Sequence, residues 1–120
     1  MTDRELYERA VEAAANAYAP YSNFHVGAAL LLRDGRVVTG ANVENASYPL
    51  GVCAERAALS RAVAEGVKPG DVEAIGITAS PCGGCRQWLL EFRLDRAAFM
   101  HEGELLVRTP AELVPDSFEL

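Results

Sequence analysis

The sequence predicts a three-layer α/β/α sandwich around a five-stranded mixed sheet. Two observations lead to this fold class: a helical pattern is followed by a β-hairpin, and two further helical patterns then alternate with short apolar strands. Strands that alternate with helices after an opening hairpin imply a mixed sheet with helices on both faces. Nothing in the composition shifts sharply along the 120 residues, so we expect one domain over residues 1–120.

The first part of the chain predicts a helix and then a hairpin. Apolar residues recur at helical spacing from Asp3 to Tyr18, and Pro20 would end that helix. Two apolar runs, Val26 to Leu32 and Arg36 to Gly40, flank the turn signal Asp34-Gly35. We therefore expect an antiparallel pair of strands directly after the first helix.

The second part predicts a long loop and the remaining elements. Ala41 to Val52 is rich in Asn, Ser, Gly and Pro, and a loop of this length is a candidate for function. The elements expected after it are a helix from Cys53 to Glu65 that stops at Gly66, a strand from Glu73 to Ala79, a helix from Gly84 to Leu94, strands from Ala97 to His101 and Leu105 to Thr109, and a helical turn from Pro110.

Composition narrows the class of partner. A net charge of -6 argues against binding to nucleic acid, which usually requires clustered Lys and Arg, so a small neutral ligand fits better. The N-terminal residues lack an apolar signal region and no apolar run is long enough for a membrane span, so we expect a cytoplasmic protein without a membrane partner. Half of the residues are hydrophobic in a small domain, and self-association would cover part of that surface.

The three cysteines have a spacing typical of a metal site. Cys82 and Cys85 lie three residues apart at a predicted helix start, and Cys53 lies at another, two residues before Glu55. Catalytic zinc sites use three protein ligands and leave the fourth position to water, which matches this count. The alternatives are a structural zinc site completed by His25 or His101, and three unconnected buried cysteines.

The order of the motifs indicates a family. Cys-x-Glu followed by Pro-Cys-x-x-Cys is the signature of zinc deaminases, and it is present in full at residues 53–55 and 81–85. The chain resembles the small homotetrameric zinc-dependent cytidine deaminases over nearly its whole length. The stretches that carry the resemblance are, in order, Pro20–Leu30, Gly40–Tyr48, Val52–Arg56, Ser80–Gln87 and Glu112–Phe118.

The resemblance implies a reaction and a set of catalytic residues. It implies hydrolysis of cytidine and 2'-deoxycytidine to uridine and 2'-deoxyuridine with release of ammonia, as in pyrimidine salvage. One Zn²⁺ per chain would be held by Cys53, Cys82 and Cys85, and would make hydroxide available near neutral pH. Glu55 would carry protons between the attacking water, the ring N3 and the departing ammonia.

The resemblance also implies how the nucleoside is bound. Asn42 and Glu44 lie two residues apart, so in an extended segment their side chains face the same way, and they would bind the sugar 3'-hydroxyl. Phe24 would form the aromatic wall of the pyrimidine pocket, and Ala54 would join the substrate contacts. The structural alternatives are a polar turn for the loop pair and a core position for Phe24.

Three residues are assigned to the surroundings of the site. Arg56 is expected to form a hydrogen bond with a ligand sulfur, with an ordinary surface arginine as the alternative. Phe118 would reach into the site of a neighbouring subunit, and Tyr48 would serve across an interface in the same way. On this interpretation the homotetramer shares its active sites between subunits.

Two competing functions follow from the same residues. One is a deaminase of a related aminonucleoside, or of a base in a larger molecule. Asn42 and Glu44, as a sugar-binding pair, argue against this function. The other is a non-catalytic, zinc-stabilised interaction domain. That second function predicts that Glu55 is dispensable and that a protein side chain fills the fourth zinc position.

Overall fold

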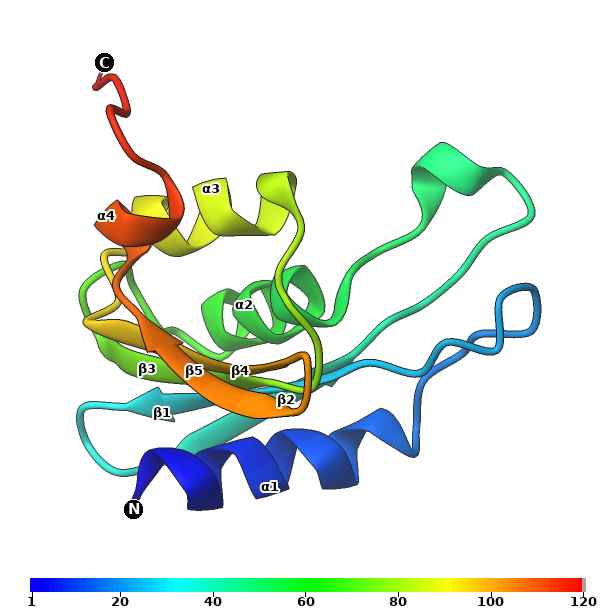
Figure 1. Ribbon diagram of the computed structural model, residues 1–120, viewed down its shortest axis with the longest axis horizontal. Coiled ribbons are helices and arrows are strands. Elements are labelled where there is room, and N and C mark those ends of the chain that lie inside the picture. Colours follow the sequence, from blue (N-terminus) through cyan, green and yellow to red (C-terminus); the bar gives the residue numbers. More distant parts are fainter. Residues whose placement is uncertain (120) are drawn as a thin grey trace.

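Five strands form a single sheet in the order β2-β1-β3-β4-β5 (Figure 1). The computed structural model describes residues 1–119. The β3 and β4 strands are parallel and the other neighbours are antiparallel, so the sheet is mixed, as predicted. The elements are α1 (Asp3–Ala14), β1 (Gly27–Leu32), β2 (Val37–Ala41), the short 3-10 helix η1 (Tyr48–Leu50), α2 (Ala54–Ala64), β3 (Val72–Ile77), α3 (Gly83–Glu91), β4 (Arg96–His101), β5 (Glu104–Arg108) and α4 (Pro110–Leu113).

Helices cover both faces of the sheet. In Figure 1, α1 lies below the sheet, whereas α2 and α3 lie above it. One core cluster packs Leu6 and Ala10 of α1 against Leu31, and the larger one packs Leu59 of α2 and Leu89 of α3 against the opposite face. All six residues of β1 are buried because both of its faces are covered. The predicted α/β/α sandwich is therefore confirmed.

The first helix is shorter than predicted. It begins with a capping box between Thr2 and Glu5, but it ends at Ala14 and does not reach Tyr18. The Tyr18 N–H donates to the Asn42 carbonyl at 3.0 Å, and its carbonyl accepts from the Glu44 N–H at 2.8 Å. These long-range β-type bonds replace helical ones, so the helix stops well before Pro20. The bounds of the other predicted elements differ from the observed ones by no more than about three residues.

The long predicted loop is part of an arm that extends beyond the sheet. The segments 18–26 and 42–53 run side by side toward η1 (Figure 1). Val43 bridges to both Tyr18 and Val52, which gives the arm a short, regular base. The predicted loop begins one residue later than expected, because Ala41 still pairs with Gly27 in the sheet. It also contains one helical turn, η1.

Gly40 allows α2 to lie directly against β2. A Cβ atom at this position would lie 2.4 Å from the Ala58 nitrogen and 2.7 Å from the Ala54 oxygen, both of them backbone atoms of α2. Any larger residue would push the helix away from the sheet. The glycine thus fixes the height of the α2 N-terminus above the sheet.

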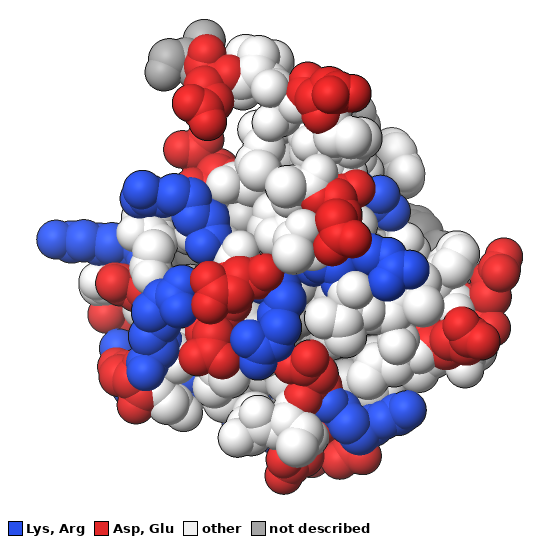
Figure 2. Space-filling view, turned by 60° about the vertical axis from the view of Figure 1, so that its left-hand side comes forward, with Lys and Arg blue, Asp and Glu red and all other residues white. Residues whose placement is uncertain are grey.

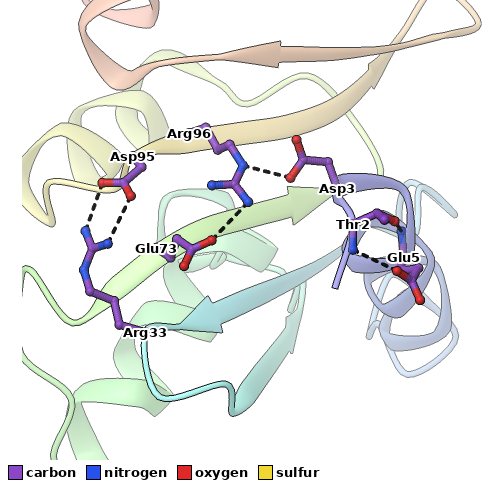
Figure 3. A network of polar contacts seen from close by, with 7 residues as sticks. All are labelled: Thr2, Asp3, Glu5, Arg33, Glu73, Asp95 and Arg96. Carbon is purple, nitrogen blue, oxygen red and sulfur yellow. Dashed lines mark hydrogen bonds and ion pairs between the residues drawn. The ribbon is translucent and has the colours of Figure 1, made fainter.

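Ion pairs join the start of α1 to the sheet (Figure 3). Arg96 on β4 donates to Asp3 at 2.8 Å and to Glu73 on β3 at 3.1 Å. Arg33 makes a bidentate pair with Asp95, at 3.0 and 2.9 Å.

On the face drawn in Figure 2, acidic and basic side chains are interspersed. Within residues 1–119, no helix combines the length and the apolar character that crossing a membrane requires.

Candidate active site

Three thiols from two helix starts converge at one point. Cys53 is the N-cap of α2, Cys82 is the N-cap of α3, and Cys85 lies in the first turn of α3. Their sulfur atoms all lie within 4.8 Å of one another, and the Cys53 and Cys82 sulfurs are 4.0 Å apart. The N-terminus of a helix carries partial positive charge, so the two helix starts place that charge beside the three sulfur atoms.

The donor set fits a zinc ion. Tetrahedral zinc with Zn–S bonds of about 2.3 Å separates its sulfur ligands by about 3.8 Å, close to the spacing found here. Among residues 1–119 the cluster consists of the three cysteines, and neither His25 nor His101 belongs to it. The geometry therefore does not support a structural site completed by histidine, and the three cysteines are not unconnected core residues.

A buried carboxyl group stands beside the thiols. Glu55 lies in the first turn of α2, and the residue is 4% exposed. Burial raises the pKa of Glu55, and a hydrogen bond with Cys85 and the charge of Arg56 oppose that rise. Burial also raises the pKa of the Cys85 thiol. Acidic groups gathered at a desolvated point favour a cation between them, and a carboxyl with a raised pKa suits proton transfer.

Arg56 supplies positive charge beside the sulfurs. Its Nη2 donates to the Cys53 Sγ at 3.2 Å, and this contact raises the pKa of the guanidinium. Its Nε is buried and has no hydrogen-bond partner among the described residues. Three thiolates carry one more negative charge than a divalent cation neutralises, and a guanidinium in contact with one of them offsets that excess.

A cavity of about 720 Å³ opens in front of this cluster. Its volume lies within the range of small-molecule sites. Cys85 is fully buried behind the cavity, and its sulfur belongs to the cluster although the residue is not part of the wall. The predicted site residues that line the cavity are Phe24, Asn42, Glu44, Tyr48, Cys53, Ala54, Glu55, Arg56 and Cys82.

Phe118 lies apart from the cavity of its own chain. It follows α4 and is 79% exposed. In Figure 1 the C-terminal segment leads away from α4 on the side of the molecule opposite η1. Tyr48 lies on η1, where it lines the cavity and is 90% exposed.

Asn42 and Glu44 form side-chain hydrogen bonds with the neighbouring segment of the arm, residues 18–26. Glu44 accepts hydrogen bonds from the Tyr21 N–H at 2.9 Å, from the Ser22 N–H at 3.1 Å and from the Ser22 hydroxyl. The hydrogen bond from the Ser22 hydroxyl, reinforced by the backbone donors, holds the pKa of Glu44 below its usual range. Asn42 accepts from the Val26 N–H at 2.8 Å and donates to the Phe24 carbonyl at 2.9 Å.

Two residues beside the site were not identified from the sequence. Ser22 contacts Glu44 from the opposite strand of the arm, 22 residues away in the chain. Arg86 donates to the Pro81 carbonyl at 2.9 Å and to the Ser80 hydroxyl at 3.3 Å, and so holds the turn that presents Cys82. Each lies inside a stretch that carries the family resemblance, which is the one signal that could have indicated it.

Fold and site together define an α/β domain with a three-cysteine metal centre and an adjacent carboxyl group. The family model described as "Cytidine and deoxycytidylate deaminase zinc-binding region" matches residues 1–101. The chain belongs to this family, and the cluster of Cys53, Cys82 and Cys85 is able to hold its zinc ion.

Relatives with known names cover almost the whole chain. A cytidine deaminase of Halalkalibacterium halodurans is 45% identical over 97% of this chain and 94% of that protein. One from Mycobacterium tuberculosis is 46% identical over 96% of this chain and 88% of that protein. The crystal structure of a cytidine deaminase from Burkholderia pseudomallei superposes with a TM-score of 0.90 at 46% identity, covering 98% of this chain and 100% of that one.

Proposed function

We propose that the protein hydrolyses cytidine and 2'-deoxycytidine to uridine and 2'-deoxyuridine, with release of ammonia, in pyrimidine salvage. The observation that carries this function is the buried carboxyl group of Glu55 beside three clustered thiols, at the wall of a cavity of about 720 Å³. Relatives of similar length and more than 40% identity are named cytidine deaminases. Residues 1–120 act as one catalytic domain in this proposal.

Glu55 is the proton carrier in this proposal. A zinc ion held by Cys53, Cys82 and Cys85 would lower the pKa of a bound water and so supply a nucleophile near neutral pH. Glu55 accepts the proton that the attacking water loses and delivers it to the ring N3, which makes C4 electrophilic. It then takes the remaining proton of the hydroxyl group added at C4 and transfers it to the amino group, which leaves as ammonia while the C4 carbonyl forms. Burial raises the pKa of Glu55 above its ordinary value, which brings the carboxyl closer to a group that can both accept and release a proton.

Asn42 and Glu44 together leave room for one hydroxyl group. A carboxylate has about four acceptor positions, and three protein donors occupy three of those on Glu44. The Asn42 amide has two N–H donors, and one of them is occupied by the Phe24 carbonyl. A hydroxyl that donates to Glu44 and accepts from Asn42 satisfies both remaining positions. The sugar 3'-hydroxyl has this chemistry, and a free base lacks it.

The remaining substrate contacts come from the walls of the cavity. Phe24 is 61% exposed and lines the cavity, so its ring is available to a planar base. Ala54 is fully buried directly before Glu55, where its small side chain leaves space for the ring. Tyr48 stands on η1 at the outer part of the arm.

We also propose that the active protein is a homotetramer that shares its sites between subunits, located in the cytoplasm. Phe118 and Tyr48 are highly exposed aromatic side chains, and burial against a neighbouring subunit would remove their apolar surface from water. Three free thiols are best preserved in a reducing compartment, which supports the cytoplasmic location. The preferred partner is a small nucleoside rather than a nucleic acid.

One experiment tests the function directly. Purified protein is incubated with cytidine while ammonia release and ultraviolet absorbance are followed, and zinc content is measured on the same sample. We expect one zinc per chain, turnover by the native protein, and a loss of about a thousandfold or more in kcat for Glu55→Gln with zinc retained. Glu65→Gln, an exposed acid at the end of α2, is the matched control and keeps native turnover.

Other outcomes distinguish the competing functions. Zinc binding with no turnover of cytidine, in the native protein and in Glu55→Gln alike, would support the non-catalytic interaction domain. Faster turnover of an aminonucleoside with a different base than of cytidine would support the related deaminase. Equal rates of native protein and Glu55→Gln on cytidine would remove Glu55 from the mechanism.

A further inference from the structure

Ser22 connects two of the proposed substrate-binding residues through a single hydroxyl group. Its Oγ donates to the Glu44 Oε2 and accepts from the Phe24 N–H at 3.0 Å. Ser22 also donates its backbone N–H to the Glu44 Oε1 at 3.1 Å, and it lines the same cavity. One side chain therefore holds both the carboxylate that is proposed to bind the sugar and the backbone of Phe24, whose ring is proposed to form the aromatic wall.

The Ser22 hydroxyl determines which hydrogen-bond acceptor position of the Glu44 carboxylate stays free. Both backbone donors, Tyr21 and Ser22, bind Oε1, whereas the Ser22 hydroxyl is the protein donor to Oε2. With that hydroxyl in place, Oε2 has about one acceptor position left for substrate, at a fixed angle. Without it, the carboxyl group is held at one oxygen and turns more freely about that contact.

The same hydroxyl stabilises the turn before Phe24. Asn23, between Ser22 and Phe24, has a φ of 58°, a left-handed conformation that Asn tolerates better than most residues. The Asn23 N–H donates to the Ala19 carbonyl at 3.0 Å, and the Phe24 N–H donates to the Ser22 hydroxyl. Such a conformation persists when the surrounding hydrogen bonds determine it, and the Ser22 side chain supplies one of them.

We propose that Ser22 is a positioning residue for nucleoside binding, which aims the Glu44 carboxylate at the sugar and places Phe24 at the base. This inference rests on the proposed function, because it takes the ligand to be a pyrimidine nucleoside. It assigns Ser22 an effect on nucleoside affinity and on recognition of the sugar 3'-hydroxyl. It assigns no part in the proton transfers of Glu55.

The test measures binding of uridine, the product, by calorimetry, so that no turnover is required. We expect Ser22→Ala to raise the Kd for uridine about tenfold, the factor that corresponds to one hydrogen bond of ordinary net strength. Ser22→Thr keeps the hydroxyl on an exposed residue and should restore the affinity to within about threefold of native. Ser60→Ala, which removes an exposed serine hydroxyl from α2, is the matched control with native affinity.

Sugar discrimination separates a positioning role from general loosening of the arm. The ratio of the Kd for 3'-deoxyuridine to that for uridine should fall in Ser22→Ala toward the ratio in Glu44→Gln, and adding Ser22→Ala to Glu44→Gln should have little further effect. With cytidine, KM should rise while kcat stays within about twofold of native.

Several results would overturn the inference. They are an unchanged Kd in Ser22→Ala, an unchanged discrimination ratio, or no rescue by Ser22→Thr. If the native protein binds uridine but does not deaminate cytidine, the proposed reaction is wrong and the binding comparison still decides the role of Ser22. If the native protein binds neither uridine nor cytidine, both proposals are wrong.

Discussion

Replacing Gly40 with alanine is expected to move the end of α2 that carries the zinc ligand. The added Cβ would lie 2.4 Å from the Ala58 nitrogen, about 1 Å closer than the 3.4 Å at which ordinary contact begins. The opposing atoms belong to the α2 backbone, so rotation of a side chain cannot relieve the clash. The helix must therefore move by roughly 1 Å relative to β2, and Cys53 and Glu55 move with it.

Two effects of different size follow from that shift. Overpacking of this kind destabilises a protein by about 1 to 3 kcal/mol, measurable by urea unfolding. A displacement of about 1 Å between catalytic groups lowers kcat/KM by about a hundredfold, measurable with cytidine. Gly35→Ala is the control, since Gly35 has a φ of 93° with open space around it. Strain of about 1 kcal/mol at the hairpin should lower the stability of that variant and leave its kinetics native.

The refuting result is a Gly40→Ala protein with native kcat/KM and native stability. It would show that α2 adapts to the added methyl group without moving the site. Equal losses of activity in Gly40→Ala and Gly35→Ala at a temperature where both are folded would also refute the reasoning, because the hairpin turn lies away from the cavity wall.

Two further predictions concern residues around the site and the sheet. Arg86→Ala releases the turn before Cys82 and should weaken zinc binding about tenfold in a chelator competition, while Arg108→Ala, an exposed arginine on β5, should not. A hydrogen bond from Arg33 lowers the pKa of Asp95, so this pair contributes stability above the ordinary aspartate pKa of about 3.9 and loses it as pH falls through the lowered value. Urea unfolding of Arg33→Ala should therefore show a deficit at pH 7 that becomes smaller as the pH falls below about 4.

Each of these predictions has an outcome that contradicts it. Equal zinc affinities of Arg86→Ala and the native protein would mean that the turn before Cys82 holds its shape without the arginine. A stability deficit of Arg33→Ala that stays constant from pH 7 to pH 3 would mean that the ion pair does not act through the charge of Asp95.

The sequence was sufficient for features that depend on nearby residues. The strands and the starts of α2 and α3 follow from local periodicity. The clustering of Cys53 with Cys82, 29 residues away, was expected from the family signature and not from any local pattern. The end of α1 did not follow, because bonds from Tyr18 to Asn42 and Glu44 determine it. Ser22 was missed for the same reason, since its contact with Glu44 depends on two strands of the arm that lie side by side only in the folded chain.

The most direct test of the account is X-ray absorption at the zinc edge of the purified protein. We predict three sulfur scatterers at about 2.3 Å and one light atom at about 2.0 Å that behaves as water, because Cys53, Cys82 and Cys85 are the clustered donors. A spectrum with two sulfurs, or with the outer-shell signals of a histidine ring, would contradict this account.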